Sequence, residues 1–371
     1  MRNEEKIRLD ALDVARALGL LFVYYGHFVE QLMYLKNPAA AVHYKWIYSF
    51  HMILFFILSG WTKGINDVAL PLRSFVTSTF CARVVPYLFF SVLLASLSLV
   101  CTGWFPLVDL STARGYFLAA VSTCLGFPLF NIPLWFVACL VSVECLHRLL
   151  QKFLNSTPRI LLTALACYVA GFALNERYFF FGERMNFWLL HEVPVVYAFY
   201  LVGVLLGRSR QPIFASTPWA MAIFLVALGA VHFTFDLNQG PFRYLQAVVI
   251  LLSGHGHFLW FPFTALAGTV LVLALGHVLE NLSLLAYLGR NALILLGLNG
   301  VFYHFVNPPV AAWCVANLSA DGGMVFLAGS LVTVASFGLS LPVIYGLNDV
   351  VPQLVGKPGR AGRFFGPLLK K

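Results

Sequence analysis

Apolar segments of about 20 residues recur from one end of the chain to the other, and this repetition limits the possible folds more than any other feature of the sequence. An α-helix rises about 1.5 Å per residue, so each segment can cross a hydrocarbon core of about 30 Å. Only 11% of the residues are charged, whereas a soluble domain carries about 25%. The sequence therefore excludes a water-soluble globule and predicts an all-α, polytopic integral membrane protein.

Polar or Pro/Gly-rich breaks divide the apolar sequence into about ten expected transmembrane helices. Two further apolar pieces, 114–130 and 244–254, are short, so they are re-entrant, interfacial or extensions of their neighbours, and the count is about nine to eleven. The ten expected helices lie near residues 11–33, 43–61, 84–102, 132–150, 159–175, 187–207, 218–236, 257–279, 284–306 and 323–347.

The formal net charge of +9 comes from basic residues that gather in alternate loops, where they orient a membrane protein rather than bind nucleic acid. With an even helix count, this pattern predicts that both termini are cytoplasmic. We expect one transmembrane domain over 1–350 and a solvated basic tail over 351–371. The predicted cytoplasmic set is Arg2, Lys6, Arg8, Lys63, Arg73, Arg83, Arg148, Lys152, Arg159, Arg208, Arg210, Lys357, Arg360, Arg363, Lys370 and Lys371.

The first span holds the densest group of ionisable residues, which are costly in hydrocarbon and therefore candidates for function. Asp13 and Arg16 are three residues apart, so they share a helical face as a structural ion pair or as part of a ligand site. His27 follows Arg16 by eleven residues, which places it on nearly the same face about 16 Å further along the axis. We expect Arg16 and His27 to line one path.

Glu30 lies three residues beyond His27 on the same face, close enough to accept a proton from one ring nitrogen and fix the tautomer. This spacing is typical of a general base with an orienting carboxylate. The same spacing equally allows His27 to be a neutral core histidine and Glu30 to be a solvated residue at the outer interface.

The second span carries His51, Phe55 and Ser59 at intervals of four residues. His51 and Ser59 are about 12 Å apart along a helix, which excludes proton transfer within a serine–histidine dyad. We expect Ser59 and Gly60 to end the span and to permit close backbone approach, with His51 as a supporting hydrogen-bond donor or a packed residue. Arg83 opens the third span, either as a phosphate ligand or as an ordinary cytoplasmic anchor.

Other polar residues give weaker signals. Glu144 and His147 are spaced to pair, and His191 and Glu192 lie near the start of the sixth span. His255-Gly256-His257 presents two imidazoles, but no carboxylate or cysteine stands at a metal-ligand spacing from them. The seven cysteines include no C-x-x-C pair. We expect no metal.

Taken in order, these motifs resemble the integral-membrane acyltransferase family 3, which includes sugar O-acetylases and fucose 4-O-acetylase-like proteins. The likeness begins with Arg16 and His27 in RLDALDVARALGLLFVYYGHF and continues through FHMILFFILSG at 50–60 and ARVVPY at 82–87. Later landmarks are PLWF at 133–136, LVGVLLGR at 201–208 and LGRNALILL at 288–296. The chain departs from the family pattern at Phe80, where a second arginine is common, and at Asn299, where many members have a histidine.

The resemblance implies acyl transfer, most simply of acetyl, from a cytoplasmic acyl-coenzyme A co-substrate to a hydroxyl of a carbohydrate or glycolipid acceptor. It implies a bacterial cytoplasmic membrane and no tightly bound cofactor. His27 would be the general base supported by Glu30, while Arg16, Asp13, Arg83, His51 and Ser59 would bind the donor or substrate. Direct attack by the acceptor and an acyl-enzyme intermediate both remain open.

Two other classes of protein also fit the residues. A transporter or flippase would use the intramembrane ionisable groups as a proton or substrate path, although the sequence has no clear internal repeat. A scaffold would bind acyl-coenzyme A or a glycolipid without turnover. Release of free thiol from acyl-coenzyme A in the presence of an acceptor distinguishes the enzyme from both.

Overall fold

The computed structural model describes residues 10–66, 68–177, 187–209, 213–240, 242 and 246–369. Over these residues the chain forms helices and short turns, with no β-strand beyond an isolated bridge between Val249 and Gly254. The helices are α1 (Asp10–Tyr34), α2 (Pro38–Tyr48), α3 (His51–Ile65), α4 (Leu72–Thr79), α5 (Val85–Ser98), α6 (Ala113–Cys124), α7 (Trp135–Leu150), α8 (Thr157–Arg177), α9 (Val193–Ser209), α10 (Thr217–Thr234), α11 (Trp260–Val278), α12 (Ser283–Arg290), α13 (Ala292–Val301), α14 (Asn307–Asn317) and α15 (Gly322–Val350). The turns are η1 (Phe80–Val84), η2 (Ile132–Leu134), η3 (Phe187–Leu189), η4 (Ile250–Leu252), η5 (Phe302–Val306) and η6 (Pro352–Val355).

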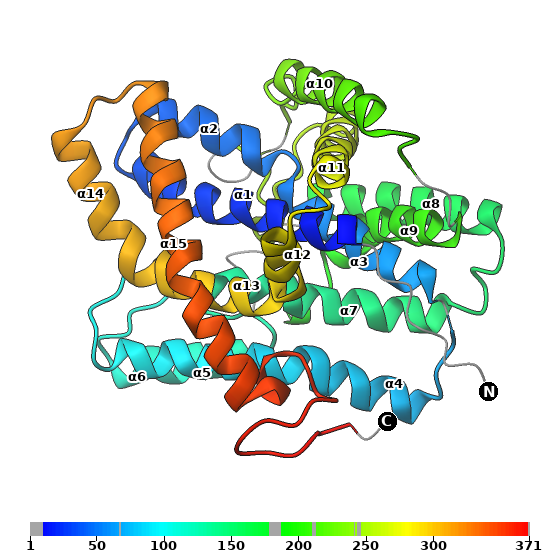
Figure 1. The fold of residues 1–371 in the computed structure, drawn as a ribbon, viewed down its shortest axis with the longest axis horizontal. Helices are drawn as coiled ribbons and strands as arrows, with labels where there is room; N and C mark the ends of the chain where they lie inside the picture. The colour runs from blue at the N-terminus through cyan, green and yellow to red at the C-terminus, as the bar shows by residue number, and fades with distance from the viewer. Residues whose placement is uncertain are drawn as a thin grey trace.

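Within the described ranges, nine helical segments are long and apolar enough to cross a membrane, and α9 is a shorter apolar helix. The prediction of an all-α polytopic membrane protein is confirmed. The most buried of these segments is α1, which runs through the centre of the molecule with α3, α11, α12 and α13 packed around it (Figure 1). The central position of α1 explains how its polar residues avoid lipid.

Several predicted boundaries differ from the structure. The third span begins at Leu72 rather than at residue 84, and the ninth is interrupted at Asn291 and then continues to Asn317. The second span does not end at Ser59 and Gly60, because α3 continues to Ile65. Six of the predicted cytoplasmic basic residues lie outside the described residues, namely Arg2, Lys6, Arg8, Arg210, Lys370 and Lys371.

Close packing of α3 against α9 depends on glycines at every fourth position of both helices, namely Gly60 and Gly64 in α3, and Gly203 and Gly207 in α9. A Cβ atom at Gly60 would lie 1.9 Å from the carbonyl oxygen of Tyr200. Small residues at this spacing let the backbones of membrane helices come into contact. The predicted close approach at Gly60 is therefore confirmed.

Two π-helical turns, η1 and η5, interrupt the spanning helices just before prolines. In η1 the Val85 amide donates to the Phe80 carbonyl, and Pro86 follows. A proline ring clashes with the carbonyl four residues earlier in a regular α-helix, and the wider π turn relieves that clash. The two turns carry Arg83 and His304, so each turn rotates a polar side chain relative to the helix before it.

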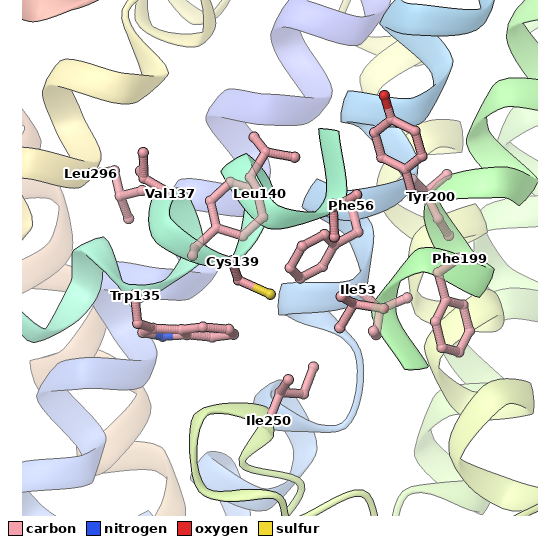
Figure 2. Close-up of a cluster of buried hydrophobic side chains, with 14 of the residues drawn as sticks. Ile53, Phe56, Trp135, Val137, Cys139, Leu140, Phe199, Tyr200, Ile250 and Leu296 are labelled. Carbon is pink, nitrogen blue, oxygen red and sulfur yellow. The ribbon is translucent and has the colours of Figure 1, made fainter. Parts of the chain in front are cut away.

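The core includes a buried loop between α10 and α11. Residues 247–255 of this loop are largely buried, and Ile250 packs in the same apolar cluster as Ile53, Trp135 and Cys139 (Figure 2). Of the short segment predicted at 244–254, residues 246–254 form a loop inserted among the helices. The other short segment, at 114–130, contains most of α6.

Candidate functional site

A cavity of about 780 Å³ lies at the end of the bundle where α1 begins. Its walls come from α1, α3, α4, η1, α7, α9, α12 and α13, together with the segment that follows α15. Two lining residues, Asp13 and Glu144, are acidic, whereas six are cationic, namely Arg16, Lys63, Arg83, Arg148, Arg290 and Lys357. The beginning of α1 and the segment that follows α15 therefore meet at one cationic cavity on one side of the protein.

Arg16 and Asp13 form the ion pair that their spacing predicts. Arg16 Nη1 donates to Asp13 Oδ1 at 2.6 Å, and Nη2 donates to Thr62 Oγ1 at 2.5 Å. Thr62 belongs to α3, so the guanidinium joins the first helix to the third. The Arg16 side chain keeps 24% of its surface exposed, and it lines the cavity.

Arg83 enters the cavity wall from the π turn η1 and pairs with Glu144 of α7. Arg83 Nη2 and Nε lie 3.1 and 3.3 Å from the same oxygen, Glu144 Oε1. The predicted pairing of Glu144 with His147 is wrong, because the His147 ring contacts the Tyr197 hydroxyl at 3.2 Å instead. Arg83 also lies in the middle of a continuous helical segment rather than at its start. Phe80, where family members often carry a second arginine, is 51% exposed.

His27 is buried between α1 and the junction of α13 with η5. Its Nδ1 lies 2.5 Å from Asn299 Oδ1, and the Tyr303 ring meets the imidazole edge to face at 5.0 Å. An amide oxygen accepts, so this contact places the ring proton on Nδ1 and leaves Nε2 with a free lone pair. No sequence feature indicates this contact, apart from the departure from the family pattern at Asn299.

The cavity does not reach His27. Its α1 lining ends at Val23, four residues or about 6 Å short of the histidine along the helix axis. The expectation that Arg16 and His27 line one continuous path is therefore wrong for the cavity in this structure. Apolar side chains, including those of Val23 and Met52, line the cavity at this depth.

Glu30 does not contact His27. Its two carboxylate oxygens accept hydrogen bonds from Tyr34, at 3.0 Å, and Tyr48, at 3.3 Å. The prediction that Glu30 orients His27 is wrong, because the two tyrosine hydroxyls hold the Glu30 carboxylate. Asn299 contacts His27 instead. Glu30 is only 7% exposed, so it is not the solvated interface residue of the alternative interpretation either.

An aromatic cluster surrounds Glu30 at the end of α1 opposite the cavity. Tyr34 lies against Trp104, with ring centroids 5.4 Å apart, and Trp104 lies near Tyr303. The Trp104 loop is fixed to η5 by two bonds: its amide donates to the His304 carbonyl at 2.8 Å, and His304 Nδ1 lies 2.7 Å from its carbonyl. The π turn thus joins the His27 environment to an outer aromatic surface.

His51 and Ser59 lie on α3 but do not act together. His51 Nδ1 lies 2.9 Å from the Ile47 carbonyl, and Ser59 Oγ donates to the Phe55 carbonyl at 2.7 Å. Ser59 lines the cavity, whereas His51 is 1% exposed and lies within electrostatic range of His27. The exclusion of a serine–histidine dyad is confirmed.

Glu192, just before α9, is fully buried and joins the α10–α11 loop to the bundle. Its carboxylate accepts from Ser253 at 2.8 Å and pairs with His255 at 2.7 Å and His191 at 3.1 Å. Burial alone would disfavour the ionised carboxylate, and the contacts with Ser253, His255 and His191 offset that cost. His257 points elsewhere, because its Nδ1 accepts from the amides of Leu259 and Trp260.

The fold and the cavity define a polytopic all-α membrane protein with a cationic cavity at one end. A family model described as an acyltransferase domain matches residues 9–348. Because the match covers nearly the whole chain, the protein belongs to the integral-membrane acyltransferase family 3. It is therefore an acyltransferase that transfers groups other than aminoacyl groups. Comparisons with curated proteins and with solved structures return no match.

Proposed function

We propose that the protein transfers an acyl group, most simply acetyl, from acyl-coenzyme A to a hydroxyl of a carbohydrate or glycoconjugate acceptor. The observation that carries this proposal is the cationic cavity, with Arg16 and Arg83 in its walls. Guanidinium groups match phosphate oxygens in geometry and charge. A volume of about 780 Å³ also lies within the range of about 300–1,000 Å³ that is usual for ligand sites.

The cavity leads the donor towards His27. From Arg16 to His27 the axis of α1 rises about 16 Å, which is comparable with the reach of a pantetheine arm. The last turn, from Val23 to His27, is closed in this structure. We infer that Met52, an unbranched and adaptable side chain, turns aside when the thioester enters.

His27 then acts as the general base. With Nδ1–H donated to Asn299, Nε2 takes the proton of the acceptor hydroxyl while the hydroxyl oxygen attacks the thioester carbonyl carbon. A new ester bond forms, the carbon–sulfur bond breaks, and the thiolate of coenzyme A leaves and recovers the proton from the imidazolium. An acyl-histidine intermediate is the alternative chemistry, and it would be trapped as radiolabelled protein in the absence of acceptor.

The acceptor is proposed to approach from the opposite end of α1. The aromatic rings of Tyr34 and Trp104 there suit the apolar face of a sugar, and the Glu30 carboxylate is an acceptor for its hydroxyls. In this proposal His27 lies between donor and acceptor, and the protein works in the cytoplasmic membrane of a bacterial cell.

The test is an assay of the purified full chain in detergent with acetyl-coenzyme A and a panel of cell-surface glycans. We expect thiol release that depends on acceptor, and its loss in His27→Ala. His232→Ala, which removes an exposed histidine on α10, is the matched control and should retain activity. Full acetyl transfer by a folded His27→Ala variant would show that His27 is not the general base. If the wild-type protein releases no thiol with any acceptor, acyl-coenzyme A is not the donor.

A further inference from the structure

Residues 351–358, which follow α15, fold back onto the bundle, although the charge of this region predicts a solvated tail; most of residues 359–369 are exposed. Pro352–Val355 forms the turn η6, in which Pro352, Gln353 and Val355 are buried. The Gln353 side-chain amide donates to the carbonyls of Phe365 and Gly366. These bonds tie the residues that follow η6 to the turn itself, and η6 packs against η1 and α5. The segment is therefore packed into the same cavity wall that contains Arg83.

Gly356 has a left-handed backbone conformation, and Lys357, the next residue, lines the cavity. Gly356 has φ of +89° and closes η6 with its amide bonded to the Pro352 carbonyl. This backbone conformation favours glycine, and a Cβ atom at this position would lie 2.6 Å from Leu293 Cδ2, so the Leu293 side chain would have to move. Gly356 and Lys357 consequently line the cavity together with Leu293 at the start of α13.

The Lys357 ammonium is fixed by two asparagines. Its Nζ donates to Asn291 Oδ1 at 2.5 Å and to Asn348 Oδ1, while Asn348 Nδ2 donates to Asn291 Oδ1 at 2.8 Å. Asn291 is buried at the break between α12 and α13 and is held by the Tyr287 carbonyl. The two amide oxygens orient the ammonium group, so Lys357 holds a defined position at the cavity wall.

We propose that Lys357 binds a phosphate group of the acyl donor, so that the folded-back segment is part of the donor site. The inference rests on the proposed function, because it requires a phosphorylated thioester in the cavity. An ammonium group that two asparagine side chains already orient loses little freedom on binding a phosphate oxygen, and a charge-assisted hydrogen bond forms. Lys357 therefore acts in donor affinity and not in the chemical step.

The experiment measures equilibrium binding of coenzyme A to the full chain in detergent, and the KM and kcat for acetyl-coenzyme A. We expect Lys357→Gln to weaken binding and raise KM by about tenfold or more, with kcat at saturating donor unchanged. Lys357→Arg, which keeps the charge, should recover most of the affinity. Arg360→Gln is the matched control, because it removes an exposed positive charge from the same segment outside the cavity lining, and it should change binding less than about twofold.

Each result has one meaning. If the wild-type protein binds no coenzyme A, the donor assignment of the proposed function fails and this inference fails with it. If the wild type binds and Lys357→Gln binds equally well, or if Lys357→Gln and Arg360→Gln lose affinity equally, only the inference is overturned. Dephospho-coenzyme A then locates the contact: an equal loss for both ligands supports the diphosphate, and a loss for coenzyme A alone supports the terminal phosphate.

Discussion

His27 Nδ1 of α1 lies 2.5 Å from Asn299 Oδ1 of α13, and this contact fixes which ring nitrogen carries the proton. The lone pair of Nε2 is thereby available to a substrate hydroxyl. Asn299 is fully buried, and it stands in a region where many family members have a histidine. The proposed base and the side chain that orients it are thus 272 residues apart in the sequence.

The first prediction concerns Asn299. Asn299→Leu removes the accepting oxygen and lets the ring adopt the other tautomer, so kcat should fall by about tenfold or more, whereas His27→Ala should cost about 10²–10⁴-fold. Asn299→Asp keeps an accepting oxygen and should retain more activity than the leucine variant. Initial rates of thiol release at saturating donor and acceptor provide the measurement. Equal rates in wild type and a folded Asn299→Leu would show that the contact is merely structural.

Glu30 provides the second prediction. Because its carboxylate is held by Tyr34 and Tyr48 and not by His27, Glu30→Gln should raise the KM for the acceptor about tenfold and change kcat little. Steady-state kinetics with acceptor varied at fixed acetyl-coenzyme A separates the two parameters. A loss of kcat as large as that of His27→Ala, at unchanged acceptor KM, would restore Glu30 to a direct part in proton transfer.

The sequence predicted those features of the site that depend on local spacing. The Asp13–Arg16 pair is a consequence of three-residue separation on a helix, and the span of α1 follows from its apolar run. The partners of His27 and Arg83 are 272 and 61 residues away. No periodicity within one helix specifies such contacts, because they depend on how the helices pack. Glu30 shows the consequence, since its correct spacing from His27 did not produce a contact.

The predicted start of the third span at a proline and the predicted solvation of the basic tail were wrong for a related reason. Pro86 indicates a helix start in isolation, but the π turn before it allows the helix to continue from Leu72 to Ser98. The tail from Val351 is basic, yet Gln353 and Val355 are buried against the bundle. In both places tertiary packing overrides the local preference, and both places lie at the cavity wall.

The third prediction concerns the ion pair of Arg83 with Glu144. Arg83→Gln removes a cavity guanidinium and should raise the KM for acetyl-coenzyme A by about tenfold or more. Glu144→Gln removes a competing carboxylate, so the same KM should stay constant or fall. Arg73→Gln, an exposed arginine on α4 outside the cavity lining, controls for the loss of charge. A donor KM that is unchanged in Arg83→Gln would exclude this arginine from the donor site.

The fourth prediction concerns the contribution of Glu192 to the stability of the fold. Glu192→Ala leaves Ser253 and His255 without their buried partner, and the free energy of unfolding should fall by about 3–5 kcal/mol. Glu280→Ala, which breaks the partly exposed contact with His277, should cost less than about 1 kcal/mol. Thermal melts in detergent test both, and a Glu192→Ala melt that matches the wild type would contradict a role in fixing the loop.

The fifth prediction tests the glycine contact between α3 and α9. Gly203→Leu places a side chain where a Cβ would already lie 2.0 Å from the Ile57 carbonyl oxygen, so α9 must separate from α3 and the protein should lose its folded yield in detergent. Gly338→Leu on α15 is the matched control, because nothing lies within 4 Å of the added Cβ and a leucine there faces outward. The measurement is the monodisperse fraction on size-exclusion chromatography with the melting temperature of what remains. Since α3 and α9 supply Ser59, Thr62 and Tyr200 to the cavity wall, any folded Gly203→Leu protein should also bind coenzyme A more weakly, whereas equal binding would show that the cavity does not depend on this helix contact.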